Sequence, residues 1–396
     1  MKLPPGLSAP PNSVCKLERS LYGLKQASRQ WNHKLCSVLK ASGYIQLRAD
    51  HSLFTKGSST AFTALLVYVD NLVLAGNGMK EIERVKALLD AKFKIKDLGV
   101  LKYFLGFEVA RSSQGILLYQ RKYAIDLLDE FGLLNAKPSS TPMNYTAPLS
   151  KDAGSPLSDL TPYRRLIGRL LYSTNTRPDI SFAVNKLSQY LDCATDVHFK
   201  AGLHILKYIK GAPARGILFS TASDLCLIGY SDSDWATFPD TRRSVSGFCF
   251  FLGSSIVSWK SRKHLTMARS SAEAEYRALA LATCKGRWLT YILRDLQVPL
   301  RRPITLFCDN QSVIHIASNP VFHERTKHIE IDCHTVRDRV QDGSLKLLPV
   351  PSSEQVADIL TKSLAPGPFA KIHCKLGKHD IHVPCLMEAD RRESSS

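Results

Sequence analysis

The chain has 396 residues, 44% of them apolar, and a formal net charge of +18 at pH 7. This length allows two or three domains with cores of their own, which excludes a small fold that depends on disulfides. The 53 Lys and Arg residues against 35 Asp and Glu favour a polyanionic partner such as nucleic acid. The alternative is that the charge only keeps the protein soluble.

The ten cysteines form no C-x-x-C pair and no zinc-ligand spacing. We therefore expect reduced thiols and an intracellular protein, cytoplasmic or nuclear. Met1–Gly6 lacks the apolar core of a signal peptide, and the most apolar run, Phe62–Gly76, is short and contains Asp70. We expect neither a signal peptide nor a membrane span.

The first part of the chain predicts a mixed α+β unit. The expected elements are a helix over Leu21–Leu39, strands at Leu53–Phe54 and Ala61–Ala75 around a turn, a helix over Met79–Phe93, and strands near Tyr103–Val109 and Gly115–Leu118. The second strand run bends at Asp70 and Asn71, so a hairpin tip would present Asp70. An ordinary core hairpin is the alternative.

The next part, Tyr123–Gly211, is predicted to be mostly helical, with an irregular linker at Pro138–Ser158. From Leu225 the pattern changes. It predicts three short strands and a long helix, followed by further strands and helices: Leu225–Tyr230, Ser246–Leu252, Ile256–Trp259, helix Ser271–Leu296, strand Ile304–Cys308, helices Ser312–Ala317 and Lys327–Gln341, strand Leu345–Val350, helix Val356–Leu364. This order is typical of an α/β domain.

Four acidic residues lie where separate elements of that domain would meet. Asp232 ends the first strand, Glu275 lies in the first turns of the long helix, Asp309 follows the fourth strand, and Asp358 lies in the last helix. Converging carboxylates of this kind can hold two Mg²⁺ ions about 4 Å apart for phosphodiester hydrolysis. Taken singly, Asp309 could instead cap a helix, and Asp358 could be an exposed helical acid.

Two of the four have an acidic neighbour that competes for the same role. Ser270 and Glu273 fit a capping box, which gives Glu273 a structural task and leaves Glu275 free. Asp234 has the same strand parity as Asp232. We prefer Asp232 because it directly ends the apolar run.

Basic side chains cluster between residues 260 and 302, where ten Lys and Arg residues face three acids. We expect the first four to bind nucleic acid: Lys260, Arg262, Lys263 and Arg269.

Six motifs of the carboxyl-terminal half resemble one family. They are Gly229–Ala236, Ser258–Ser261, Ser270–Tyr276, Cys308–Ser312, Lys327–Asp332 and Gln355–Lys362. In sequence and order they resemble the ribonuclease H domain of plant copia-type LTR retrotransposon Pol polyproteins. The resemblance implies that the four acids are catalytic, bind two Mg²⁺ ions and serve the hydrolysis of RNA in RNA/DNA hybrids. Many cellular ribonucleases H carry a histidine before the last acid, and Val350–Gln355 has none, so we expect slow turnover.

Four motifs of the front half resemble the reverse transcriptase and thumb of the same family: Lys16–Trp31, Val67–Asn71, Leu101–Gly106 and Arg165–Tyr172. The resemblance makes Asp70 a polymerase metal ligand. Asn71 stands where the family has a second aspartate, and the family's early palm aspartate lies upstream of the segment that Met1–Gly6 resembles. We therefore expect an inactive polymerase, with Asp70 as its vestige. An active one would need another polypeptide to supply the missing strand.

Together these inferences predict an α/β chain. Residues 1–110 are expected to be a truncated α+β palm and fingers remnant, 111–220 a helical thumb or connection, 221–372 a ribonuclease H-like α/β domain with a mixed sheet, and 373–396 a disordered tail. The expected activity is Mg²⁺-dependent cleavage, with RNA/DNA hybrid or other nucleic acid as partner. The alternative is a catalytically dead, hybrid-binding remnant of a retrotransposon.

Overall fold

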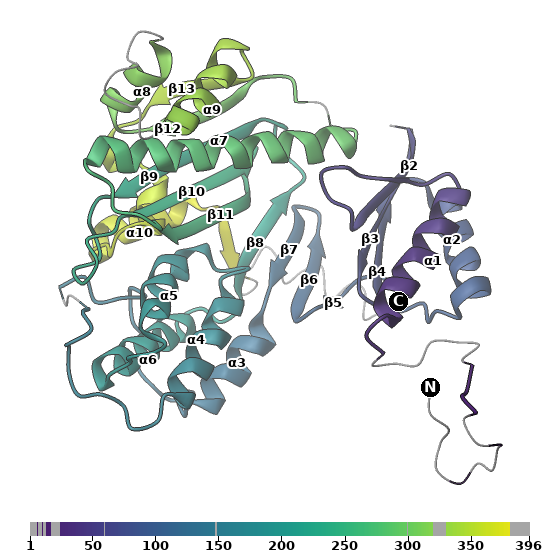
Figure 1. The fold of residues 1–396 in the computed structure, drawn as a ribbon, viewed down its shortest axis with the longest axis horizontal. Helices are drawn as coiled ribbons and strands as arrows, with labels where there is room; N and C mark the ends of the chain where they lie inside the picture. The colour runs from purple at the N-terminus through teal and green to yellow at the C-terminus, as the bar shows by residue number, and fades with distance from the viewer. Residues whose placement is uncertain are drawn as a thin grey trace. The chain divides into compact units, whose positions relative to one another are not determined.

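The structure is a computed structural model that describes residues 6, 10, 13–16, 24–58, 60–146, 149–298, 300–319 and 330–380. The chain divides into two compact units, residues 1–98 with 291–298, and residues 99–290 with 299–396. Both contain helices and β-strands (Figure 1). In the described ranges, no helix combines the length and apolar character needed to cross a membrane.

The first unit is an antiparallel sheet in the order β1-β2-β3-β4, covered by two helices (Figure 1). Its elements are α1 (Ala27–Ala41), β1 (Ile45–Gln46), β2 (Leu53–Ser58), β3 (Ala61–Tyr68), β4 (Asn71–Gly76) and α2 (Met79–Phe93). Leu39 of α1, Leu65 of β3 and Leu89 of α2 are fully buried in one core. α2 has the predicted bounds, whereas α1 begins later than predicted, and residues 21–23 of the expected helix lie outside the described part.

The second unit contains a five-stranded sheet in the order β14-β8-β7-β6-β5. Its strands are β5 (Tyr103–Phe104), β6 (Phe107–Ser112), β7 (Gly115–Tyr119), β8 (Arg215–Ser220) and β14 (Lys378–Asp380). We expected the strands near residues 103–118 to complete the amino-terminal unit. They form a sheet that continues instead from β7 to β8, where Leu117 and Leu118 lie opposite Leu218 and Ile217.

The predicted helical region forms a layer of four α-helices in this unit: α3 (Arg121–Glu130), α4 (Thr161–Ser173), α5 (Ser181–Leu187) and α6 (Asp196–Lys210). Between α3 and α4, the described part of the predicted linker contains no helix or strand. Tyr163 and Leu187 are buried between the helices, and the Tyr163 hydroxyl donates a hydrogen bond to the Leu187 carbonyl at 2.7 Å. Amphipathic spacing therefore predicted this layer correctly.

A mixed sheet in the order β11-β10-β9-β12-β13 forms the rest of the second unit. Its strands are β9 (Leu227–Asp234), β10 (Val245–Leu252), β11 (Ser255–Lys263), β12 (Ile304–Cys308) and β13 (Leu345–Pro349). β10 pairs antiparallel with both β9 and β11, whereas β12 runs parallel to β9 and β13. The associated helices are α7 (Ser271–Asp295), α8 (Gln311–Ser318), α9 (Glu330–Gln341) and the 3₁₀ helix η5 (Val356–Leu360).

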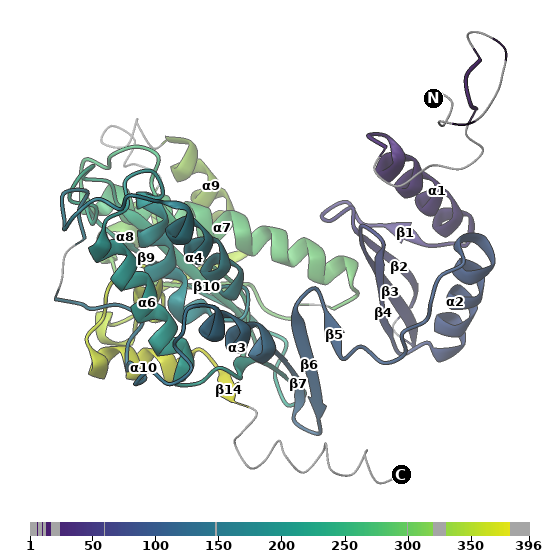
Figure 2. The same ribbon diagram turned by 90° about the horizontal axis from the view of Figure 1, so that it is seen from below.

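Side chains of β10 alternate between two cores. Phe248 and Phe250 pack with Tyr276 of α7 in one core, whereas Cys249 and Phe251 belong to the core that contains the helical layer. The continuous apolar run of β10 is explained by this burial on both faces. Figure 2 shows the second unit from below, with α10 (Pro366–Lys375) and β14 near the described carboxyl end.

Two predictions near the carboxyl end differ from the structure. The helix expected over Val356–Leu364 is the shorter η5, which ends where the Thr361 hydroxyl turns to donate a hydrogen bond to Asp232. Residues 373–380, expected in the tail, complete α10 and form β14, which pairs with β8. Residues 381–396 of the expected tail lie outside the described part.

Candidate active site

The four predicted acids come from β9, α7, the end of β12 and η5. Asp232 lies inside β9, two residues before its end, and is 1% exposed. Glu275 lies in the first turns of α7 and is 7% exposed. Asp309 directly follows β12, and Asp358 lies in the middle of η5. The structure brings the four together, since each carboxylate interacts electrostatically with at least one other of the set.

Lys362 lies between two of these carboxylates. Its Nζ is 2.7 Å from Asp358 Oδ1 and 3.3 Å from Asp232 Oδ1. The hydroxyl of Thr361 donates a hydrogen bond to the other oxygen of Asp232. One half of the acidic cluster is thus neutralised by a cation of the chain itself.

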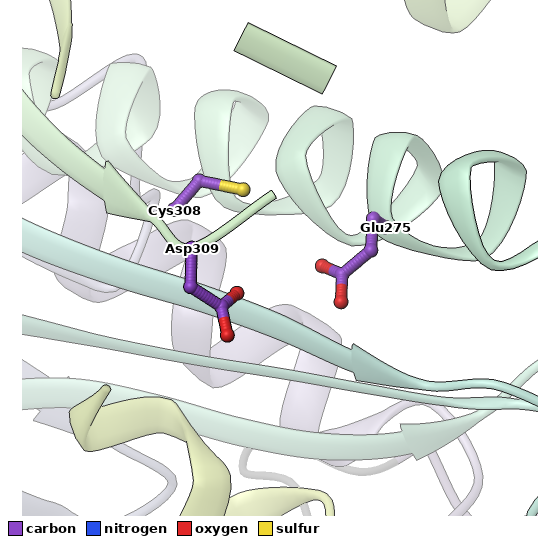
Figure 3. Close-up of side chains that lie close together, drawn as sticks. All are labelled: Glu275, Cys308 and Asp309. Atoms are coloured by element: carbon purple, nitrogen blue, oxygen red, sulfur yellow. The ribbon is translucent and has the colours of Figure 1, made fainter. Parts of the chain in front are cut away.

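The other half of the cluster contains Glu275 and Asp309. Figure 3 shows the carboxylate of Glu275 on α7 facing that of Asp309, with Cys308 beside them. One oxygen from each carboxylate and the Cys308 sulfur lie within 4.8 Å of one another. Burial raises the pKa of the Cys308 thiol, so it stays protonated and is a poor ligand for a hard cation.

Asp309 is held by two polar side chains from the segment before η5. Ser352 Oγ donates to Asp309 Oδ2 at 3.0 Å. Gln355 Nε2 lies 3.5 Å from Asp309 Oδ1 and donates to the carbonyl of Ser231 at 3.0 Å. These contacts link β12, β9 and η5, and they occupy the loop in which many cellular ribonucleases H carry a histidine.

Burial and neighbouring carboxylates raise the pKa of Glu275 and that of Asp232. Burial raises the pKa of Glu275 most, and the nearby Asp232 and Asp309 carboxylates raise it further. Burial also raises the pKa of Asp232; the Lys362 ammonium opposes that change, and Asp358 adds to it. Acids this close and this buried are costly without cations between them.

These residues fit divalent cations of the kind that the sequence implies. All four acids offer hard oxygen ligands, which suit Mg²⁺. Within the described ranges, Glu275 Oε2 is a buried oxygen with no hydrogen-bond donor. A cation at Glu275 and Asp309 would satisfy this oxygen and lower the repulsion between the carboxylates.

The start of α7 determines which glutamate is available to the site. Ser270 Oγ accepts from the backbone N–H of Glu273 at 3.2 Å, as the capping box predicted. The Glu273 carboxylate accepts from the N–H of Arg269 at 2.8 Å and pairs with Arg277 at 2.7 Å. Glu273 therefore has the predicted structural task, and Glu275 reaches the cluster.

Sequence reasoning missed Thr361, Lys362, Ser352 and Gln355. Their contacts join segments more than 40 residues apart, which helical or strand periodicity does not detect. The one local signal was the spacing of Asp358 and Lys362, four residues apart with opposite charge.

The four basic residues predicted to bind nucleic acid do not share one surface. Lys260 and Arg262 lie on the same face of β11 and line a common cavity. Lys263 points to the other face, with its Nζ 4.2 Å from the centre of the Phe238 ring. Arg269 precedes α7 and is exposed.

Asp70 lies at the hairpin tip between β3 and β4, as the sequence predicted, and is exposed. Asn71 Nδ2 donates to Asp70 Oδ1 at 3.3 Å. Within the described ranges, the one cluster of three or more potential metal-binding side chains is that of Glu275, Cys308 and Asp309. Among the described residues, Asp70 therefore belongs to no cluster that could hold a metal ion.

The order of elements from β9 onward defines an α/β protein of the ribonuclease H fold. Three antiparallel strands and a long helix come first, followed by a parallel strand, two further helices, another parallel strand and a final helical turn. Residues 1–145 match the family described as reverse transcriptase (RNA-dependent DNA polymerase). The Retrovirus-related Pol polyprotein from transposon RE1 of Arabidopsis thaliana is 41% identical over 379 residues, 95% of this chain and 26% of that protein. A putative transposon Ty5-1 protein of Saccharomyces cerevisiae is 32% identical over 281 residues, 70% of this chain and 91% of that protein.

The chain belongs to the family of copia-type retrotransposon Pol polyproteins. It spans about a quarter of the length of the plant polyproteins that it matches. Two solved structures are also similar. The match to the foamy viral protease-reverse transcriptase in complex with dsDNA covers 84% of this chain and 60% of the viral chain, with 15% identity and a TM-score of 0.44. The match to an RNase H domain from Mycobacterium tuberculosis covers 38% of this chain and 98% of that domain's chain, with 13% identity and a TM-score of 0.25.

Proposed function

We propose that the carboxyl-terminal half of this chain hydrolyses RNA in RNA/DNA hybrids with Mg²⁺. Two observations carry the proposal: Asp232, Glu275, Asp309 and Asp358, from four separate elements, form one electrostatically linked cluster, and a buried oxygen of Glu275 has no donor in the described ranges. The family relationship supports it, because the matched polyproteins are retrovirus-related.

Each residue of the cluster has a defined part in this proposal. Two bound Mg²⁺ ions would activate a water molecule and stabilise the leaving oxygen. Glu275 and Asp309 offer their oxygens to the open half of the cluster, and Asp232 and Asp358 offer theirs to the half that Lys362 neutralises. Ser352 and Gln355 hold Asp309 in place, so its carboxylate does not have to be ordered when substrate binds.

Cleavage of a labelled hybrid by the purified chain tests this proposal. Asp309→Asn should lower the rate about a thousandfold, because the lost charge is worth about 4 kcal/mol at 4 Å and an effective dielectric near 20. Asp338→Asn is the matched control, since Asp338 is exposed on α9, away from the cluster. Equal rates for wild type and Asp309→Asn would refute the assignment.

One observation favours a second function, binding of hybrid without cleavage. Lys362 already neutralises part of the acidic cluster, as a cation would. A hybrid-binding protein of this kind would bind with steep salt dependence and show no turnover that depends on metal. Full protection of the hybrid at saturating Mg²⁺, with binding retained, would favour this function over the first.

We also propose that the polymerase half does not extend primers by itself. The support is the tip pair of Asp70 and Asn71, in which a neutral amide stands beside the one carboxylate. Polymerisation by two metal ions needs several carboxylates at that point. Template-dependent extension of an annealed primer by the isolated chain, abolished in Asp70→Asn, would contradict this proposal.

A further inference from the structure

A groove lies between the edge strand β11 and helix α7. It has a volume of about 560 Å³, and its walls come from β10, β11 and one stripe of α7. The stripe consists of Leu281, Cys284, Lys285 and Trp288, which follow one another with helical spacing. We call this cavity the β11–α7 groove.

The charge that lines the groove has one sign. Lys260 and Arg262 project from β11, Lys285 projects from α7, and the described residues that line the cavity include no acid. Among the described residues, none of the three cations has a carboxylate within 4.0 Å. The groove is therefore an uncompensated positive site.

The lysines of the groove repel one another. Burial lowers the pKa of Lys285, and the Lys260 ammonium across the groove lowers it further. Lys285 lies over the ring of Trp288, with its Nζ 3.6 Å from the ring centre, and this contact supplies part of the missing stabilisation. An anion between the two lysines would remove the repulsion.

The groove is separate from the acidic cluster. Lys260 and Arg262 lie on the face of the sheet that α7 covers, whereas Asp232 lies on the face that contacts η5. Lys285 follows Glu275 by ten residues on α7, which is about 15 Å along a helix axis. That distance corresponds to roughly four or five nucleotides of a strand at about 3.4 Å each.

We propose that the β11–α7 groove binds the sugar–phosphate backbone of nucleic acid four or five nucleotides from the bond that is cut. The inference rests on the proposed function for its substrate, and it adds a second contact surface remote from the acids. Phosphates contact Lys260, Arg262 and Lys285, while Trp288 gives the ribose an apolar surface. Phosphate contacts of this type set the position of a duplex without reading its sequence.

A protein partner is less consistent with these residues. Protein interfaces are depleted of lysine at their centre, whereas nucleic-acid sites combine lysine, arginine and exposed aromatic rings without acids. Lys260 and Arg262 are both exposed and can reach a backbone without rearrangement of β11.

Binding of a fluorescent hybrid to the full chain tests the inference, with Ca²⁺ in place of Mg²⁺. The double variant Lys260→Gln/Lys285→Gln should bind a long hybrid about tenfold more weakly at about 0.1 M salt. The slope of log K against log salt should fall by roughly one for each lysine.

Lys346→Gln is the matched control, because Lys346 is exposed on β13 at the opposite edge of the same sheet. Thermal unfolding of each variant shows that the fold is intact. If the double variant binds the long hybrid with the affinity and salt slope of wild type, the inference is wrong. It is wrong also if binding is unchanged but the oligomeric mass falls, because the groove would then hold protein.

These outcomes are distinguishable from failure of the proposed function. Binding is measured without turnover, so a chain that never cleaves can still show the lysine-dependent change and support the inference. A chain that cleaves, with no lysine dependence of binding, would retain the proposed function and lose the inference.

Discussion

Lys362 is the residue that most changes the expected behaviour of the acidic cluster. Its ammonium contacts Asp232 and Asp358, whereas none of the described Lys or Arg residues forms an ion pair with Glu275 or Asp309. The two halves of the acidic cluster therefore differ in net charge, and a divalent ion would bind them with different affinity. We expect the first ion to bind at Glu275 and Asp309, and the second to compete with Lys362.

Replacing Lys362 tests this asymmetry. Lys362→Gln should raise the affinity of the weaker of two Mn²⁺ ions at least tenfold, because a positive charge within about 4 Å of both ligands is removed. Titration calorimetry of the purified chain measures both affinities without substrate. Lys362→Arg, which keeps the charge, should resemble wild type. A weaker second site in Lys362→Gln would contradict the prediction.

The raised pKa values of the acids predict how stability depends on pH. In the ion-free protein the pKa of Asp232 is raised from 3.8 to about 7 and that of Glu275 from 4.5 to about 9. The folded state therefore keeps protons that the unfolded state releases, so stability declines as pH rises from about 4; the decline due to Asp232 is complete near pH 7 and that due to Glu275 near pH 9. The midpoint of thermal unfolding in chelator should fall across this range, and added Mg²⁺ should restore it.

The double variant Asp232→Asn/Glu275→Gln serves as the control for this effect, since it removes both titrating groups. Its unfolding midpoint should change less with pH than that of wild type. An unfolding midpoint of the wild type that rises over the same range would show that the carboxylates are ionised in the ion-free fold.

Sequence reasoning at the residue scale predicted the four acids and the capping role of Glu273. Those residues stand at element ends or in local motifs, where the sequence carries the signal. Their catalytic role stays a prediction. Thr361 and Lys362 were missed because their contact with Asp232 crosses from η5 to β9, and local spacing says nothing of that packing.

The contact between β10 and η5 is the element-scale feature that positions Asp358. Gly247 of β10 lies against η5, where a Cβ atom would approach Thr361 Cγ2 at 2.6 Å and Leu360 Cβ at 2.8 Å. Both neighbours belong to the segment that carries Asp358 and Lys362. A glycine at this point lets the helical turn sit directly on the sheet.

Gly247→Ala should therefore displace η5. We expect a loss of about 1 to 3 kcal/mol in the free energy of unfolding, measured in urea, together with a loss of hybrid cleavage. Gly168→Ala in α4 is the matched control, because no atom lies within 4 Å of its added Cβ. That change should leave cleavage intact and stabilise the protein by about 0.5 to 1 kcal/mol. Wild-type stability and cleavage in Gly247→Ala would show that η5 adapts.

The elements that the sequence predicted best carry local signals. Met79–Phe93 and Ile304–Cys308 have the predicted bounds, because each is a regular apolar pattern between breaks. The last predicted helix became the shorter η5, because tertiary contacts of Thr361 took precedence over helix propensity. β14 was missed, because three residues without a pattern are held by pairing with β8, more than 150 residues away.

At the scale of the whole molecule, the helical layer and the mixed sheet of the second unit share one core. Phe182, Val184 and Leu187 of α5 belong to the same buried cluster as Cys249 and Phe251 of β10. The indole N–H of Trp259 also donates to the carbonyl of Thr174 at 3.1 Å. The expected boundary at residues 220 and 221 therefore runs along a hydrophobic interface.

Truncation should reveal this dependence. A fragment of residues 221–380 would expose the apolar face that α5 covers, so it should lose more than about 5 kcal/mol relative to a fragment of residues 99–380. Urea unfolding and dye binding to exposed apolar surface measure the difference. Equal unfolding free energies for the two fragments would show that the helical layer contributes little.

The pairing of β14 with β8 has a topological consequence. Asp380 lies opposite Arg215, so the strand that precedes the mixed sheet and the strand that follows its last helices are hydrogen-bonded neighbours. The intervening 215–380 segment is thus a closed loop of chain whose two ends meet. A chain cut at the exposed turn of Gly343 should therefore stay assembled, because the β8–β14 pair still joins the two pieces.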